Sequence, residues 1–175
     1  MTTPVIGWER ETPVPNDYAF NDYLNARNGR LFYEDLDLTG LMMPGADDQG
    51  PGQTLPSPLE IVYLPMIRRR IDQLRRAFAD AAAEVGYPGR FHYAYASKAN
   101  TAEEVVRTVL LAGAHYEMSS VTDINIATLM RAAGYITPER MVIANGFKPA
   151  GTDYARYLLR FRAMHDALIP VVEDF

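Results

Sequence analysis

The feature that most constrains the fold is a strand-like segment followed by a helix-like segment, repeated along residues 59–175. Short apolar, β-branched runs alternate with stretches whose apolar residues recur every three or four positions. The repeat interval is about 22 to 27 residues, which is typical of βα units in a parallel sheet with right-handed crossovers. The pattern predicts an α/β protein, either a doubly wound sheet or a barrel, and periodicity alone does not choose between them.

Five runs are predicted to be strands, with helices between them. A proline after the first run suits the first turn of a helix, which is expected to end at Gly86. Thr101 and Glu104 fit a capping box for the next helix, and Gly113 and Gly134 follow the ends of two later helices. The first helix has apolar positions at Ile67, Ile71, Leu74, Phe78, Ala82 and Val85. The predicted strands are LEIVYL (59–64), FHYAYASK (91–98), HYEMSS (115–120), MVIANG (141–146) and LIPVVEDF (168–175).

The part of the chain before residue 59 has a different character. It holds many of the prolines and glycines, and residues 43–58 contain almost nothing that could enter a core. Residues 1–28 are therefore expected to form an irregular N-terminal extension. Residues 29–58 are expected to form one or two short strands, within RLFYEDLDLTGLM, and a Pro/Gly-rich linker.

The composition excludes several classes of function. The chain has 22 acidic and 17 basic residues, and it has no cysteine for disulfides, thiolate zinc sites or nucleophilic catalysis. The three histidines, His92, His115 and His165, lack metal-ligand spacing and are interpreted as structural or surface residues. No apolar run is long enough to cross a bilayer, and the start does not resemble a signal peptide. We expect a cytoplasmic protein without metal, membrane or nucleic-acid partners.

Lys98 is a single charge at the end of the predicted strand FHYAYASK. The carboxyl ends of parallel strands are where α/β barrels and open α/β sheets place their chemistry. A lysine in an apolar setting can act as a free amine and form a Schiff base with an aldehyde or ketone. The alternative is an ammonium group that simply extends into solvent, and position alone favours that alternative.

Three ordered motifs shift the balance toward chemistry. They are YASKAN (95–100), GAHYEMSSVTDI (113–124) and GYITPERMVIANGFKP (134–149). Together they resemble the start of the fold-type III pyridoxal-phosphate decarboxylases, which act on ornithine, diaminopimelate or arginine and are related in fold to alanine racemase. The resemblance covers residues 59–175, and a weaker resemblance extends to the segment RLFYEDLDLTGLM.

The resemblance implies the N-terminal half of an alanine-racemase-like (β/α)8 barrel, with about four to five βα units. It implies pyridoxal 5′-phosphate as cofactor, held by Lys98 as a Schiff base, with Glu117 as the acid near that lysine. Ala96, two residues before Lys98 on the same strand face, would leave room for the cofactor ring, and its alternative role is ordinary packing. Asp123 matches a second family carboxylate, and its alternative role is to complement the helix dipole.

The implied reaction is decarboxylation of a basic amino acid. Three features favour the biosynthetic arginine branch, and hence polyamine biosynthesis. They are the segment before and around the lysine, AFADAAAEVGYPGRFHYAYASKAN (77–100), the glutamate at position 117 and the sequence NGFK (145–148). Ser97, where an aliphatic residue is usual, and the short extension before Leu59 depart from that branch. Diaminopimelate, ornithine and lysine decarboxylases therefore stay open, as does a non-catalytic decarboxylase-like binding or regulatory protein.

Other parts of the family's site belong to later sequence: the glycine-rich phosphate loop, the acid that pairs with the pyridinium nitrogen, and the substrate-binding residues. We therefore expect this chain to be only part of the active unit. A further segment, a second chain that completes the barrel or a homo-oligomer would supply the rest, and the substrate would be a small-molecule amino acid.

Overall fold

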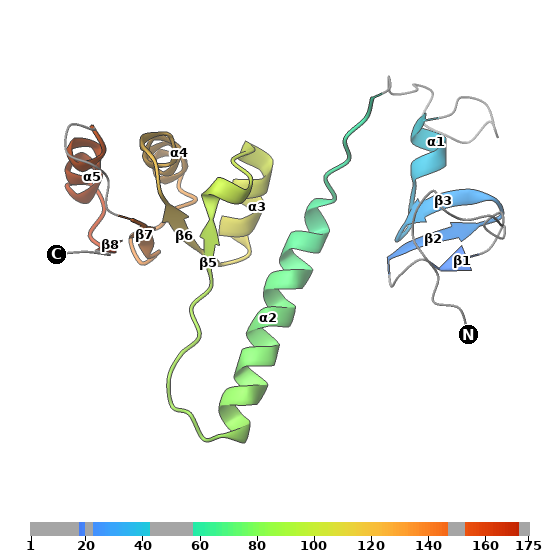
Figure 1. The fold of residues 1–175 in the computed structure, drawn as a ribbon, viewed down its shortest axis with the longest axis horizontal. Helices are drawn as coiled ribbons and strands as arrows, with labels where there is room; N and C mark the ends of the chain where they lie inside the picture. Colours follow the sequence, from blue (N-terminus) through green and yellow to red (C-terminus); the bar gives the residue numbers. More distant parts are fainter. Residues whose placement is uncertain (1–17, 20–22, 43–57, 147–152, 172–175) are drawn as a thin grey trace. The chain divides into compact units, whose positions relative to one another are not determined.

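The structure is a computed structural model that describes residues 18–19, 23–42, 58–146 and 153–171 (Figure 1). The chain divides into two compact units, Met1–Ile61 and Val62–Phe175. The predicted linker lies almost wholly outside the described residues, as does the end of the predicted strand LIPVVEDF. No helix in the described part of the chain is both long enough and apolar enough to span a membrane.

The first unit contains a small antiparallel sheet with its strands in chain order. The expected short strands are confirmed as β3 and β4, but two further strands lie in the predicted irregular extension, so that prediction was wrong. A short helix, α1, follows β4. The elements are β1 (Tyr18–Ala19), β2 (Leu24–Arg27), β3 (Arg30–Tyr33), β4 (Leu36–Asp37) and α1 (Leu38–Met42).

The missed hairpin has a sequence signal at Asn28 and Gly29. Arg27 pairs with Arg30, so Asn28 and Gly29 form a two-residue loop between β2 and β3. Both have positive φ, 51° for Asn28 and 74° for Gly29, as a type I′ turn requires. Asn-Gly between short strands favours this turn, and β2 escaped prediction because its sequence, LNAR, carries little apolar patterning.

The second unit has four parallel strands in the order β5-β6-β7-β8 (Figure 1). The predicted α/β class with a parallel sheet is therefore confirmed. Among the described residues, β5 pairs only with β6 and β8 only with β7, so a closed barrel is not formed by them. The elements are α2 (Leu64–Glu84), β5 (Ala94–Ala96), the 3-10 helix η1 (Ser97–Ala99), α3 (Glu103–Leu111), β6 (His115–Met118), α4 (Val121–Ala132), β7 (Val142–Ala144), α5 (Tyr154–Arg162) and β8 (Leu168–Pro170).

One face of this sheet packs against helices α3, α4 and α5 (Figure 1). Its central row runs through Tyr116 and Val142, which are in register and fully buried. Sequential strand order places all right-handed crossovers, and hence all three helices, on the same side of the sheet. The main core is formed by Val106, Leu110, Tyr116, Met118, Ile124, Ala127, Met130, Ile136, Val142, Ala144, Tyr154 and Phe161.

The segment before α2 is not the predicted strand. Residues 59–63 are irregular, and Ile61 and Val62 are exposed. An apolar, β-branched run becomes a strand only when a neighbouring strand accepts its hydrogen bonds, and none of the described strands pairs with this segment. The helix that follows is confirmed, with Pro65 in its first turn and Gly86 at φ 65° after its end.

Helix α2 buries much less than its apolar spacing predicts. Ile71 is its single fully buried residue, and it packs against Val105 and Val109 of α3. Phe78 and Val85, on the predicted apolar face, are 52% and 76% exposed. The C-terminal half of the helix therefore leaves much of its apolar surface exposed, although the Phe78 ring stacks on Phe91.

The strand and helix boundaries beyond α2 differ from the predictions in detail. The strand FHYAYASK forms over Ala94–Ala96 only, before the chain turns into η1. The capping box is wrong, because α3 begins after Ala102, whose N–H donates to Asn100 Oδ1 at 2.9 Å. The two glycine helix ends are confirmed, with φ of 84° at Gly113 and 82° at Gly134.

Candidate cofactor site

Lys98 lies directly beyond the C-terminal end of β5, which is the edge of the sheet that the sequence predicts. It belongs to the 3-10 helix η1 rather than to the strand, and its side chain is exposed. The strand ends at Ala96, so the expectation that Lys98 and Ala96 share one strand face is wrong. Ser97, the residue between them in the chain, begins η1 and is fully buried.

Glu117 and Ala96 are brought together by the sheet. They are register partners on β5 and β6, at the sheet's C-terminal end, in a row that Ile143 and Ile169 continue. This row alternates with the helix-packed row of Tyr116 and therefore belongs to the opposite face.

The Glu117 carboxylate is buried, with 8% of the residue exposed, and neither of its oxygens has a hydrogen-bond partner. Lys98 forms no ion pair within 4 Å among the described residues, so the predicted Lys98–Glu117 pair is absent from this arrangement. A buried carboxylate without a donor is costly. The setting of the Glu117 carboxylate therefore favours binding of a cation or a hydrogen-bond donor at this end of the sheet.

Asp123 occupies the first turn of α4, and its hydrogen bonds are those of a helix cap. Its N–H donates to Ser120 Oγ at 3.1 Å, while its Oδ2 accepts from the Ser119 N–H at 2.9 Å. Burial raises the pKa of Asp123, but the hydrogen bonds from Ser119, Ser120 and Ser97 outweigh it, and the pKa lies below its usual value. Asp123 thus lies in the first turn of the helix, where an acid complements the dipole, and a role toward the cofactor stays a prediction.

The pKa of the Tyr116 hydroxyl is raised by its surroundings. Burial raises its pKa to about 12, and the nearby Asp123 and Glu117 carboxylates, with Tyr95, add to that effect. Tyr116 therefore stays protonated at neutral pH. It belongs to the main core of the second unit.

Two histidines meet at the opposite, N-terminal end of the sheet. The Met141 N–H donates to His115 Nδ1 at 3.1 Å, so this nitrogen carries no proton. His115 Nε2 then carries the proton and donates it to His92 Nδ1, also at 3.1 Å. Burial, with the charges of Arg140 and Arg75 and the neighbouring His92, lowers the pKa of His115. Sequence spacing gave no sign of this pair, because it depends on strand register.

The described residues offer no site for a metal ion. No group of three or more His, Cys, Asp or Glu side chains is suitably placed in the described ranges. His165 is buried, and its Nε2–H donates to the Arg140 carbonyl at 2.7 Å. Its interpretation as a structural residue is consistent with that bond.

Residues 68–164, more than half of the chain, match the family model for the pyridoxal-dependent decarboxylases, pyridoxal binding domain. The chain belongs to this family, and its cofactor is pyridoxal phosphate. The predicted resemblance is confirmed. No solved structure gives a significant match.

Several curated relatives are arginine decarboxylases. The chain is 28% identical to arginine decarboxylase 1 of Oryza sativa subsp. japonica over 146 residues, which are 81% of this chain and 20% of that protein. It is 30% identical to the biosynthetic arginine decarboxylase of Alkalilimnicola ehrlichii over 132 residues, 74% of this chain and 19% of that protein. The chain thus spans about a fifth of the length of these relatives.

The residues at the C-terminal end of β5 and β6 suit this cofactor. Lys98 offers an accessible amine, and Ala96 presents a small side chain beside the Glu117 carboxylate. The unpartnered oxygens of Glu117 are an acceptor that a positively charged amine or imine would satisfy.

The cytoplasmic location stays a prediction.

Proposed function

We propose that this chain carries the cofactor-anchoring part of a decarboxylase that acts on a basic amino acid, with arginine as the first candidate. The observation that carries the proposal is the accessible Lys98 beyond β5, on the same sheet edge as the buried, unpartnered Glu117. The arginine decarboxylases among the relatives support arginine over diaminopimelate, ornithine and lysine.

In this proposal each residue has a separate task. Lys98 Nζ would hold the cofactor covalently, and the Glu117 carboxylate would accept a hydrogen bond from a positively charged donor beside it. Ala96 leaves space for a ring against the sheet, and Asp123 fixes the Ser119–Ser120 turn that follows β6. When bound, pyridoxal phosphate supplies an electron sink for the electrons left by loss of carbon dioxide.

We also propose that the active unit includes a further segment or subunit, arranged as an alanine-racemase-like barrel. Sequential strand order with helices on one side is the arrangement of half a (β/α)8 barrel, whereas a doubly wound sheet reverses its order. Parallel sheets are almost always covered on both faces. The row of Ala96, Glu117, Ile143 and Ile169 is therefore the face that a completing segment would enclose.

Cofactor attachment can be tested directly because the chain contains only two lysines, Lys98 and Lys148. Pyridoxal phosphate is added to the 175-residue chain, the adduct is reduced with borohydride, and the modified peptide is identified by mass spectrometry. We expect modification at Lys98, its loss in Lys98→Ala and its retention in Lys148→Ala. Modification at Lys148 alone, or equally at both lysines, would remove the basis for the proposed role of Lys98.

Activity is tested separately, by carbon dioxide release from arginine, ornithine, lysine and diaminopimelate in turn. Arginine is expected to be the preferred substrate once the completing segment or subunit is present. Release from another amino acid would reassign the substrate. Cofactor attachment without release from any of the four, in a completed assembly, would favour a non-catalytic decarboxylase-like protein.

A further inference from the structure

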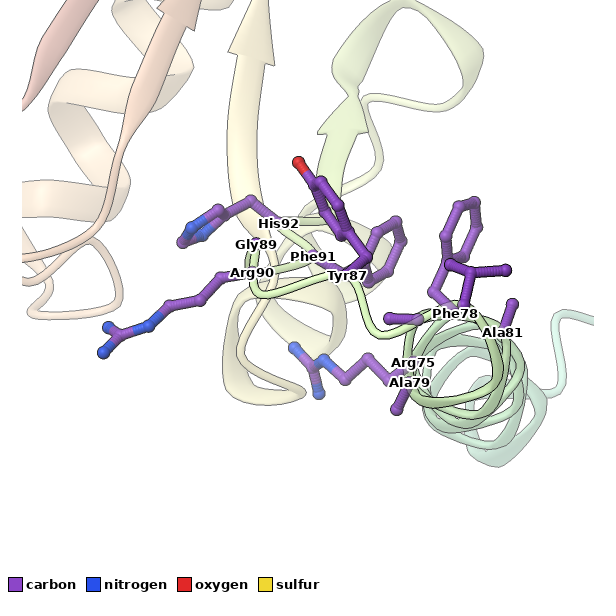
Figure 2. Close-up of a pocket in the computed structure, with 11 residues that line it drawn as sticks. Arg75, Phe78, Ala79, Ala81, Tyr87, Gly89, Arg90, Phe91 and His92 are labelled. Carbon is purple, nitrogen blue, oxygen red and sulfur yellow. The ribbon is translucent and has the colours of Figure 1, made fainter.

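Helix α2 contacts the rest of its unit along one side. Ile71 is buried against α3, and Arg75 Nη1 donates to the carbonyl of Ala112, which caps α3, at 2.8 Å. Further along the helix a pocket of about 840 Å³ opens toward residues 87–92, and Phe78 stacks on Phe91 with ring centroids 4.1 Å apart (Figure 2). The side of α2 that faces α3 is therefore occupied.

Another side of α2 is open along its C-terminal half. Leu74 is 41% exposed, Phe78 52% and Val85 76%, and Ala81 is exposed as well. Figure 2 shows Ala81 on the side of the helix away from Arg75. We call Leu74, Phe78, Ala81 and Val85 the open stripe. Their spacing of four, three and four residues is that of a seam along which two helices pack, so the open stripe suits a second helix.

Two residues of opposite charge border the open stripe, one toward each end. Arg70 and Glu84 are about four helical turns apart, so they lie on the same side of α2, and both are exposed. The Arg70 guanidinium donates to the neutral side chain of Gln73 at 2.9 Å. Glu84 forms no ion pair with any residue in the described ranges.

These two charges select the direction of a partner helix. In an antiparallel pair of α2 helices, Arg70 of each copy faces Glu84 of the other, and the twofold symmetry forms this pair twice. A parallel pair would instead place Arg70 against Arg70 and Glu84 against Glu84. Ala77 lies midway between the two charges and is small enough for the helices to approach closely. The open stripe is therefore complementary to itself in the antiparallel direction.

We propose that the open stripe of α2 is a dimerisation surface, on which a second copy of this chain packs its own α2 in the antiparallel direction. Leu74 of each copy then packs against Ala81 of the other, and the two Ala77 residues lie beside the twofold axis. The inference does not depend on the decarboxylase function, because neither Lys98 nor Glu117 belongs to the open stripe.

The chain contains no cysteine, so a single introduced cysteine reports which parts of α2 meet in the dimer. We expect Ala77→Cys to form a disulfide-linked dimer on oxidation, because its two copies lie beside the axis. Ala83→Cys is the matched control, an exposed alanine on the opposite side of the helix. Ala81→Cys separates the two directions, since its copies come within disulfide distance only in a parallel pair. Far-UV circular dichroism checks that each variant is folded.

Charge reversal tests the pairing itself, with dimerisation measured by sedimentation velocity. Arg70→Glu and Glu84→Arg should each weaken the dimer about fivefold, because symmetry removes two exposed ion pairs that are each worth roughly twofold. The double variant should restore wild-type dimerisation, because the pairs form again with their charges exchanged.

Three results would overturn the proposal. The first is a chain that stays monomeric at every concentration, which would leave the open stripe to another segment or partner. The second is a dimer in which Ala77→Cys links no more readily than Ala83→Cys, as association through the open face of the sheet would produce. The third is a double charge reversal that dimerises as weakly as the single variants.

Discussion

Asp123 shows how far residue type alone can be interpreted. An acid in the first turn of a helix is favourable for the helix dipole, and in the structure its carboxylate also binds the Ser119 N–H. Both observations are satisfied by a cap, so they cannot assign a cofactor role. Lys98 differs, because no local feature of η1 requires a lysine at an exposed position.

His115 gives a prediction about pH at the residue scale. Burial and nearby positive charge lower its pKa in the folded state, so the unfolded chain binds a proton more readily. The resulting stability is fully present above the unfolded pKa of about 6.5 and is lost as the pH falls toward the folded pKa. Protonation at Nδ1 would also oppose the Met141 N–H. We expect the free energy of unfolding to decrease as the pH is lowered below about 6.5.

Urea denaturation between about pH 5 and pH 8 measures this dependence. His115→Asn retains an acceptor near the Met141 N–H but does not titrate, so its pH dependence should be weaker. His165, whose pKa is also lowered by burial, accounts for part of the remainder, and His165→Gln serves as the matched variant. An unchanged slope in the double variant would show that neither histidine is the source.

At the scale of elements, α2 predicts a sharp contrast between two apolar positions. Ile71 is 2% exposed and packs against α3, whereas Leu74, one turn on, is 41% exposed. Ile71→Ala should lower the free energy of unfolding by about 2–5 kcal/mol, because it leaves a cavity. Leu74→Ala should lower it by less than about 1 kcal/mol. Urea denaturation of both variants checks this, and equal losses would mean that Leu74 is also buried in solution.

The sequence predicts helices better than strands in this chain for a physical reason. The hydrogen bonds of a helix are local, so the spacing after Pro65 and the glycines at 86, 113 and 134 were sufficient to place helix ends. A strand depends on a neighbour, and residues 59–63 have none among the described strands. The same dependence hid the His92–His115 pair, because only the register of β5 and β6 brings it together.

The candidate site was predictable only in part. The motif around Lys98 and the position of Glu117 identify the C-terminal edge of the sheet, and the register of Ala96 with Glu117 agrees with that location. The sequence could not predict that η1 separates Lys98 from the strand or that Glu117 is buried without a partner. Those features depend on how the chain turns after a three-residue strand.

At the scale of the whole molecule, the sheet of the second unit has two edges that pair with no other described strand, and one face that the described helices do not cover. Ile169 lies on β8, at one edge, in the uncovered row, and is 42% exposed. Unpaired strand edges and exposed apolar surface favour association. We therefore expect the chain to self-associate when no completing segment is present.

Sedimentation velocity at increasing protein concentration measures this association. Ile169→Lys places a charge on the open edge strand and should shift the chain toward the monomer. Leu159→Lys is the matched control, because Leu159 is 72% exposed on α5 and lies outside the sheet. Association that is weakened equally by both substitutions would point to general surface charge, and a chain that remains monomeric at every concentration would contradict an interface on the open sheet. Weakening by Ile169→Lys alone would locate the interface at β8, on the face of the sheet that carries Glu117.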